Sequence, residues 1–410
     1  MKWLKALAAT GVAIIVTVPL LLPSRVEGQG ATEAPTGFDN GTNGLVDQAT
    51  HEADQAVFEQ IDEVIDGLGP TFNGQSCAEC HSTPVTGGVS IITEVRAGHL
   101  NAEGQFVPAS ALVNFGQDVI PFRSLINQKE ICDAANEELP ASENIRTLRS
   151  TLNVRGDGFV EAISDATLKS ISLSQPEGMR GQLITVPALE GGSGTGRFGW
   201  KNQHVSLLSF SSDAYLNEMG ISNQLAPNRD DITHLCGENV ADPEDEEDIE
   251  IFTRFMRATK APPRDTQLAA TAAAQAGSKL FDQIGCNTCH VRTIVTAAPG
   301  TPVAGGTFIV PAALGNKIIH PFSDFLLHNV GTGDGIVQNG PQSTRLKMRT
   351  PPLWGVRTHP AFLHNGSAAT LRDAILAHGG KTSEALAVVQ NFTNLTSTQK
   401  EQVITFLTSL

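Results

Sequence analysis

Two five-residue stretches carry side chains whose order suits one kind of chemistry: Cys77–His81 (CAECH) and Cys286–His290 (CNTCH). Each has the form Cys-X-X-Cys-His, which is typical of covalent haem attachment. Two thiols at this spacing reach the two vinyl groups of one porphyrin and form thioethers, and the adjacent imidazole becomes the proximal ligand of the iron. The sequence therefore predicts two c-type haems, held by Cys77, Cys80 and His81 and by Cys286, Cys289 and His290.

A redox-active dithiol and half of a zinc site are the alternatives for each pair of cysteines. A thioredoxin-like pair has no need of a histidine directly after it, and a zinc ribbon would not repeat that histidine. Since a histidine follows both pairs, the pattern favours haem attachment.

Residues 1–28 have the pattern of an export signal. Lys2 and Lys5 give a positive start, residues 6–22 are largely apolar, and a short polar stretch follows. An apolar run of this length fits a signal peptide and is short for a membrane-spanning helix. We therefore expect a periplasmic protein, with an uncleaved N-terminal membrane anchor as the alternative. Either outcome places the body of the chain outside the cytoplasm, where c-type haems are attached.

Cys132 and Cys236 are the cysteines left outside the two motifs. An even remainder in an exported chain favours a disulfide, because disulfides persist in oxidising compartments. Two separate buried thiols are the alternative.

The chain has 410 residues and a net charge of −15, so nucleic acid is not an expected partner. An acidic surface suits a basic electron-donor protein of the cytochrome c or cupredoxin type, although it also serves solubility alone. The acidic run Asp242–Asp248 is expected to be a solvated helix start, because negative charge is favoured at a helix N-terminus; a metal site is the alternative.

Apolar periodicity predicts helices that deliver the chain to each motif and close the C-terminal domain. Residues 82–200 lack that pattern and are expected to form loops, short strands and hairpins. Thr398 and Glu401 fit a capping box for the last helix. The expected helices are 49–66, 205–219, 249–257, 268–284 and 398–410.

The predicted fold is mainly α, with two cytochrome c-like haem domains. Residues 29–264 form the first domain, enlarged by loops and short β-hairpins, and residues 265–410 form the second. The boundary falls at 264 because Pro262 and Pro263 stop the preceding helix.

His378 is the candidate sixth ligand of the second iron. Thr370 and Asp373 fit a capping box, so a helix starts there, and Leu371, Ala374, Ile375 and His378 then share one face. A histidine on an apolar stripe beside a haem is a plausible ligand, and a hydrogen-bonded core histidine is the alternative.

The first iron has no equally good candidate. His99 is the first choice and His204 the second, and an open or water-filled site is the third. His364 lies in a tight turn and is expected to hydrogen-bond a haem propionate or the backbone. His320 and His328 are expected at the edge of the second haem, and Met219 and Met348 are alternative sulfur ligands.

Several motifs resemble the bacterial dihaem cytochrome c peroxidase superfamily, which includes MauG-type enzymes. The C-terminal pattern R-T-P-x-L, F-x-H-[DN]-G and T-L-x-x-A is matched by Arg349–Leu353, Phe362–Gly366 and Thr370–Ala374. Within that superfamily the chain resembles the dihaem oxidoreductases, also called thiol oxidoreductases. That further similarity, which extends from about residue 68 to the C-terminus, rests on Arg197–Lys201, Glu218–Ile221, Pro321–His328 and His378–Gly380.

The resemblance implies two haems near a domain interface, one a low-spin relay and the other the site of peroxide binding. In the peroxidases a methionine, and in MauG-like proteins a tyrosine, ligates the C-terminal iron where this chain has His378. Ligation by two histidines lowers the potential relative to histidine and methionine, which argues against a high-potential relay role for this haem. The peroxidases often carry calcium between domains, which this sequence does not show.

The leading functional hypothesis is a periplasmic dihaem oxidoreductase that reduces peroxide or another small oxidant. Cleavage of peroxide needs a nearby proton donor, and Glu94 and Arg96 are the candidate catalytic residues. A dihaem electron-transfer protein without a substrate and a MauG-like oxygen- or peroxide-activating enzyme are the alternatives.

Overall fold

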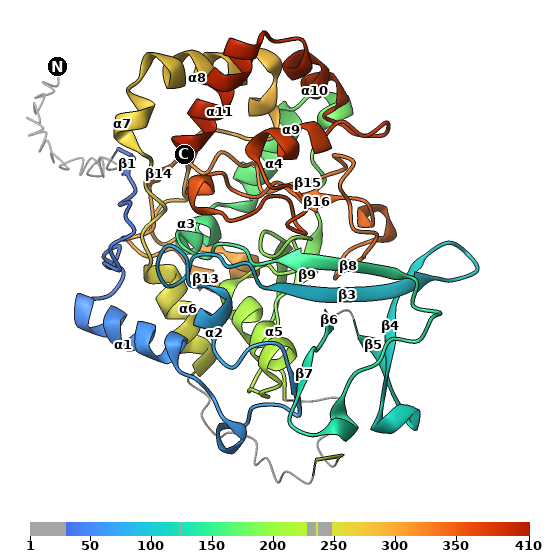
Figure 1. The fold of residues 1–410 in the computed structure, drawn as a ribbon. Coiled ribbons are helices and arrows are strands. Elements are labelled where there is room, and N and C mark those ends of the chain that lie inside the picture. Colours follow the sequence, from blue (N-terminus) through green and yellow to red (C-terminus); the bar gives the residue numbers. More distant parts are fainter. Residues whose placement is uncertain (1–29, 124, 228–234, 237–247) are drawn as a thin grey trace, which may run out of the picture. The chain divides into compact units, whose positions relative to one another are not determined.

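The computed structural model describes residues 30–123, 125–227, 235–236 and 248–410, and Figure 1 shows their fold. The expected export signal lies outside these residues, as do His234 and residues 242–247 of the acidic run. Residues 31–410 cluster into one compact unit, and the predicted boundary at 264 stays a prediction. Among the described helices, none is both long and apolar enough to cross a membrane.

Three helices enclose the first motif. α1 (Gln48–Glu59) begins where Asp47 caps the backbone N–H of Thr50, and it ends seven residues before the predicted limit. It packs on α6 (Asp248–Ala258), which in turn packs on α5 (Leu207–Met219). The rings of Phe58, Phe252 and Phe255 form the contact between α1 and α6. The helices predicted at 205–219 and 249–257 are therefore confirmed within two residues.

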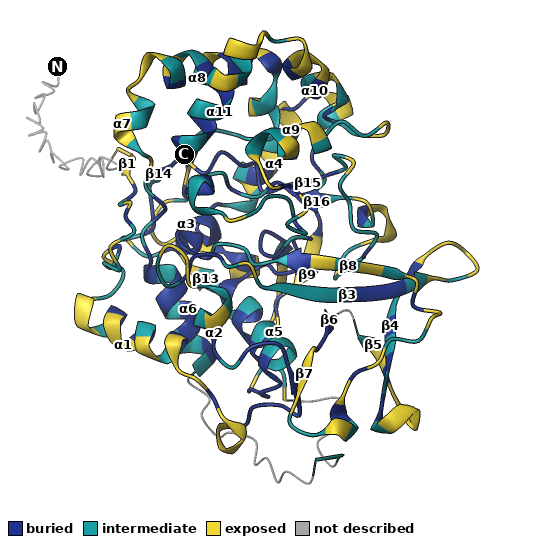
Figure 2. Ribbon diagram, viewed as in Figure 1, coloured by how far each residue is buried: buried dark blue, intermediate teal, exposed yellow. Residues whose placement is uncertain are grey.

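A five-stranded antiparallel sheet occupies much of the stretch predicted as loops, short strands and hairpins. Its central strand β3 (Thr93–Leu100) pairs with β4 (Phe106–Val113), β6 (Leu125–Ile126) and β8 (Ile145–Ser150), and β5 (Asp118–Arg123) pairs with β4. β3 and β8 lie side by side in Figure 1, in unbroken register from Thr93↔Ser150 to Gly98↔Ile145. Figure 2 shows β8 largely exposed or intermediate and β3 mostly intermediate or buried.

The second motif follows directly from a close pair of helices, α8 (Ala272–Ile284) and α11 (Ser397–Thr408). A Cβ added at Gly277 on α8 would lie 1.8 Å from the Gln402 carbonyl oxygen, so only glycine allows this approach. The capping box of α11 is made by Thr396 and Gln399, and the prediction of Thr398 and Glu401 was wrong by two residues. Helix α8 ends at Gly285, whose φ of 100° turns the chain into Cys286.

Two further short helices complete the C-terminal part, α9 (Leu371–Ala377) and α10 (Leu386–Thr393). Thr370 caps α9 as predicted, accepting from the Asp373 backbone N–H. The remaining helices are α2 (Cys77–Cys80), α3 (Asp157–Glu161), α4 (Asp165–Ser174) and α7 (Thr266–Ala269). The remaining strands are β1 (Thr32–Glu33), β2 (Thr71–Phe72), β7 (Lys129–Glu130), β9 (Thr185–Pro187), β10 (Ser193–Thr195), β11 (Ile294–Val295), β12 (Pro302–Val303), β13 (Phe308–Ile309), β14 (Lys317–Ile319), β15 (Leu327–His328) and β16 (Met348–Arg349).

The expected fold class is met in part. Helices account for 34% of the described residues and strands for 19%, so this part of the chain is more helical than stranded but carries more sheet than a mainly α fold implies. Local periodicity could not reveal this sheet, because Gly98, Pro108 and Pro121 interrupt the apolar alternation of β3, β4 and β5.

Cys132 and Cys236 form a disulfide across 104 residues of sequence, which confirms the pairing expected from the cysteine count.

We expect replacement of both cysteines by serine to lower the free energy of unfolding by about 2–4 kcal/mol, because the unfolded chain regains the entropy of a long open loop. Urea unfolding of the two proteins measures the difference. Dithiothreitol serves as the control, since it should destabilise the native protein and leave the serine variant unchanged; equal midpoints for both proteins would contradict the expectation.

Candidate haem sites

The second motif opens into a cavity of about 340 Å³ between α8, α9, α10 and α11. Cys286, Cys289 and His290 line one side of it, and His378 lines it from the end of α9. Side chains such as Phe281 and Leu407 make the walls largely apolar. The predicted residues of the second site therefore surround one apolar cavity.

Two histidines of this cavity, His290 and His378, leave the same ring nitrogen free. His290 Nδ1 lies 2.9 Å from the Phe322 carbonyl oxygen, and His378 Nδ1 lies 2.7 Å from the Ala374 carbonyl oxygen. Because a carbonyl only accepts, each Nδ1 carries the proton and each Nε2 keeps a lone pair for a metal. Burial lowers the pKa of His290 to about 4 and also lowers that of His378, so both rings are neutral at pH 7. Neutral imidazole is the form that binds iron.

His364 adds a polar group to the same cavity. It is buried, and neither of its ring nitrogens has a hydrogen-bond partner among the described residues. Its backbone oxygen accepts from the Ser150 N–H at 2.6 Å, and its ring lies against Trp200. A buried polar group without a partner costs about 1–3 kcal/mol, so this site calls for a ligand with an acceptor such as a carboxylate. Such a ligand fits the predicted contact with a haem propionate.

The first motif forms the short helix α2, capped by Ser76, whose Oγ accepts from the Ala78 N–H at 3.1 Å. His81 Nδ1 lies 3.2 Å from the Gly88 carbonyl oxygen, so its Nε2 is also left for a metal. Its ring lies edge-on to Phe58 on α1, and burial lowers its pKa. His81 thus has the same arrangement as His290.

The thiols of both motifs have raised pKa values. Burial, together with the charge of Glu218, raises the pKa of Cys77 and brings that of Cys80 to about 12, and burial raises that of Cys286 to about 12. A catalytic dithiol needs a lowered thiol pKa, because the thiolate is the reactive form. The structure therefore offers no support for the dithiol alternative.

Three charged side chains adjoin the first motif. Arg96 forms a 2.6 Å ion pair with Glu94 on β3, and Glu94 is hydrogen-bonded to Glu218 at the end of α5. The carboxylates of Glu94 and Glu218 both raise the pKa of Cys80. The Glu218 carbonyl oxygen accepts from the Asn73 N–H at 2.6 Å, which ties α5 to the segment leading into the motif.

One proton is shared by this carboxyl pair. Burial, then the charge of Glu94, raises the pKa of Glu218 well above its usual value. Burial opposes ionisation of Glu94 as well, but the Arg96 charge and the hydrogen bond to Glu218 outweigh it and lower the pKa of Glu94. Of the two carboxyl groups, Glu218 therefore holds the shared proton more tightly, and Glu94 ionises first.

His99 and Glu94 lie on opposite faces of β3, because side chains alternate along a strand of unbroken register. His99 Nδ1 pairs with Glu143 at 2.8 Å, and a third of its side chain is exposed. His204 is buried and pairs with Asp213 at 3.2 Å. Among the described contacts, none joins either histidine to Cys77, Cys80 or His81, so their role as sixth ligand stays a prediction.

Of the other histidines and methionines predicted to lie near the haems, two line the cavity and two lie elsewhere in the fold. His328 and Met348 line the cavity of the second motif, whereas His320 pairs with Glu33 at 3.0 Å and Met219 lies in the core around Phe58. Sequence reasoning assigned no role to Glu218 or Arg349, although both lie in motifs that carry the resemblance. Arg349 is buried and lines the cavity, with Nε donating to the Gly199 carbonyl oxygen at 2.9 Å.

A family model described as "Di-haem oxidoreductase, putative peroxidase" matches residues 143–410. The chain belongs to this family of dihaem enzymes, as its motifs predicted. No protein of curated function matches the sequence.

Solved structures with a similar fold share little sequence with the chain. Hydrazine synthase from Kuenenia stuttgartiensis is 16% identical with a TM-score of 0.40, over 98% of this chain and 100% of that one. A MauG-like protein associated with microbial copper homeostasis is 14% identical with a TM-score of 0.40, over 96% and 95%. The diheme peroxidase BthA from Burkholderia thailandensis E264 is 16% identical with a TM-score of 0.43, over 93% and 91%.

Proposed function

We propose that this chain is a periplasmic dihaem c-type oxidoreductase that reduces peroxide at its first haem and holds its second haem as an electron store. The difference between the two sites carries the proposal. A second histidine, His378, faces the cavity of His290, whereas acidic and basic side chains adjoin the motif of His81. The second haem would then be held by both His290 and His378, and the first would take a small oxidant beside Glu94 and Arg96.

A bound haem supplies an iron that accepts single electrons and coordinates small oxidants. The protein supplies the covalent and axial attachment: thioethers from Cys77, Cys80, Cys286 and Cys289, proximal ligands from His81 and His290, and the sixth ligand from His378. His364 would hydrogen-bond a propionate of the second haem.

Glu94, Arg96 and Glu218 supply the protons and the charge that peroxide reduction needs. Glu218 holds the shared proton more tightly than Glu94 and is hydrogen-bonded to it, so a proton can pass between the two carboxyl groups. Arg96 keeps Glu94 ionised and so ready to take up that proton. Protonation of the leaving oxygen by a positioned acid contributes about 10²–10⁴-fold to such reactions.

The electron donor in this proposal is a small basic protein of the cytochrome c or cupredoxin type. The net charge of −15 supports this choice, because opposite charge speeds the encounter of two proteins. Export of the chain, with cleavage of residues 1–28, would bring it into the compartment of such donors.

Carbon monoxide binding tests the proposed division of labour between the haems. We expect the reduced holoprotein to bind one equivalent of carbon monoxide, because ligation by His290 and His378 leaves only the first iron open. Optical titration of the reduced protein gives the stoichiometry, and mass spectrometry confirms two covalent haems in the same sample. Binding of no carbon monoxide, together with failure of peroxide to reoxidise the protein, would establish the electron-transfer alternative instead.

A further inference from the structure

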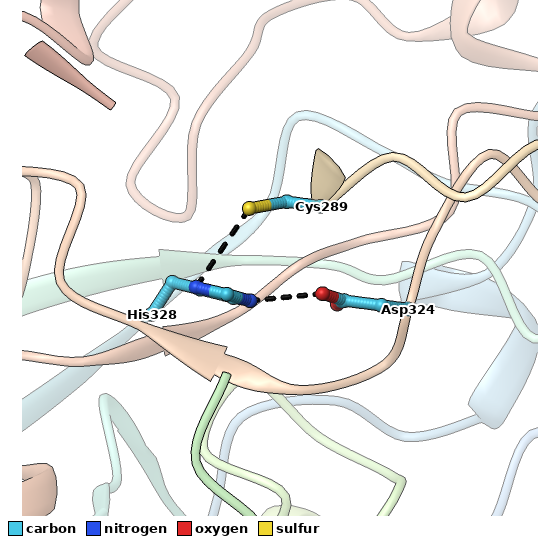
Figure 3. Close-up of side chains that lie close together, drawn as sticks. All are labelled: Cys289, Asp324 and His328. Atoms are coloured by element: carbon cyan, nitrogen blue, oxygen red, sulfur yellow. Dashed lines mark hydrogen bonds and ion pairs between the residues drawn. The ribbon is translucent and has the colours of Figure 1, made fainter. Parts of the chain in front are cut away.

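A buried cluster of charges lies beside the second motif, centred on His328 in β15. His328 Nε2 lies 2.8 Å from Asp324 Oδ2, and its Nδ1 lies 2.7 Å from Glu384 Oε2. The same Nδ1 is 3.7 Å from Cys289 Sγ. Figure 3 shows the ring of His328 between the sulfur of Cys289 and the carboxylate of Asp324. The side chain of His328 is only 2% exposed and that of Asp324 is fully buried.

His328 carries a positive charge in this cluster. A carboxylate faces each ring nitrogen, and a carboxylate only accepts, so both nitrogens donate and the ring is an imidazolium. Burial opposes that charge, but the hydrogen bonds with Asp324, Cys289 and Glu384 outweigh burial and raise the pKa of His328 to about 12. The ring therefore stays cationic across the physiological pH range.

The surrounding hydrogen bonds hold the two carboxylates in place. Asp324 accepts from Gln175 Nε2 at 2.6 Å and from the Leu326 N–H at 2.9 Å. Glu384 accepts from the Asn329 N–H at 3.0 Å and lies 3.8 Å from Lys347 Nζ. Because the two carboxylates are held in this way, the His328 ring cannot turn away from Cys289 without losing its hydrogen bonds to Asp324 and Glu384.

The sulfur, imidazole and carboxylate of this cluster would also suit a transition metal. Both ring nitrogens already donate hydrogen bonds, however, so His328 has no lone pair to offer. In the proposed holoprotein Cys289 is a thioether as well. The cluster is therefore a fixed arrangement of charges.

We propose that His328 tunes the reduction potential of the second haem, as a fixed cation that Asp324 and Glu384 hold against the thioether sulfur of Cys289. The inference rests on the proposed attachment of that haem. An added electron is stabilised by a buried cation and opposed by a buried anion, and the low dielectric of the interior strengthens both effects. Since two imidazole ligands lower the potential of a haem, the His328 cation offsets part of that decrease and keeps the second haem reducible by a donor.

Two near-isosteric substitutions give opposite expected shifts. His328→Gln removes the cation and should lower the midpoint potential of the low-spin haem, whereas Asp324→Asn removes an anion and should raise it. We expect each variant to change the ratio of reduced to oxidised second haem about tenfold at a fixed potential, equivalent to about 59 mV for one electron. Spectroelectrochemical titration of the holoprotein at pH 6 measures this shift, because His328 stays protonated there beside the remaining carboxylate Glu384.

His320→Gln is the matched control, because His320 is half exposed and pairs with Glu33 outside the cavity. Its potential should equal that of the native protein. Shifts of the same sign in the His328 and Asp324 variants, or no shift in either, would overturn the inference. If the His328→Gln protein does not accumulate, Glu384→Gln is the second variant. Asp324→Asn and Glu384→Gln each remove an anion, so both must then raise the midpoint potential of the second haem. Mass spectrometry of the native protein separates the two proposals. If it finds one haem, the proposed function is wrong. If it finds two haems and the His328 and Asp324 variants keep the native potential, only the role of His328 is wrong.

Discussion

Glu94→Gln is expected to lower the rate of peroxide reduction by about 10²–10⁴-fold while leaving both haems attached. Glutamine keeps the size of the side chain and can still hydrogen-bond Glu218, but it cannot accept and release the shared proton. Stopped-flow mixing of the reduced holoprotein with peroxide measures the rate, and the optical spectrum of the resting protein reports whether the haem sites are intact.

Glu103→Gln provides the matched control for this loss of rate. Glu103 is an exposed residue in the turn between β3 and β4, so the same change there should leave the rate unchanged. Glu218→Gln should resemble Glu94→Gln, because it removes the carboxyl group of the pair whose pKa is raised and which holds the shared proton more tightly. A Glu94→Gln protein that reacts within about twofold of the native rate would exclude Glu94 as the proton-transfer group.

His378→Ala is expected to change the second iron from six-coordinate to open. The imidazole of His378 faces the cavity with its Nδ1 held by the Ala374 carbonyl oxygen, so alanine removes the proposed ligand and leaves space in its place. The reduced variant should bind two equivalents of carbon monoxide where the native protein binds one, and a high-spin signal should appear in the electron paramagnetic resonance spectrum of the oxidised protein.

His359→Ala separates loss of a ligand from general damage to the cavity. His359 lines the same cavity, and burial lowers its pKa to about 4, but it was assigned no ligand role. Its alanine variant should keep one equivalent of carbon monoxide. The opposite result, a second binding site in His359→Ala and none in His378→Ala, would show that the sixth ligand had been misassigned.

Local patterns were sufficient to bring together the residues predicted for the second site. The motif Cys286–His290, the capping by Thr370 and the apolar face ending at His378 each depend on neighbours within a few residues along the chain, and Cys286, Cys289, His290 and His378 do line one cavity. The start of α11 shows that such a pattern can fit two neighbouring positions equally well. Thr396 with Gln399 and Thr398 with Glu401 both fit a capping box, and only the folded chain selects the first pair.

The surroundings of the first site depend on contacts that no local pattern contains. Residues 82–200 were expected to form loops, short strands and hairpins of no stated bounds, so the alternation of side chains along β3, which puts His99 and Glu94 on opposite faces, was not used. Glu94 meets Glu218 across 124 positions of sequence. Such a pairing is set by how β3 and α5 pack together, and a single sequence does not specify that packing.

The close approach at Gly277 makes the two sides of the second cavity unequal in how they can move. α8 and α11 touch backbone to backbone there, so the segment that carries His290 starts from a closely packed pair of helices. His378 instead ends the seven-residue helix α9 and is followed by Gly379 and Gly380. In the proposed holoprotein we therefore expect any exchange of an iron ligand to begin at His378, while His290 stays in place.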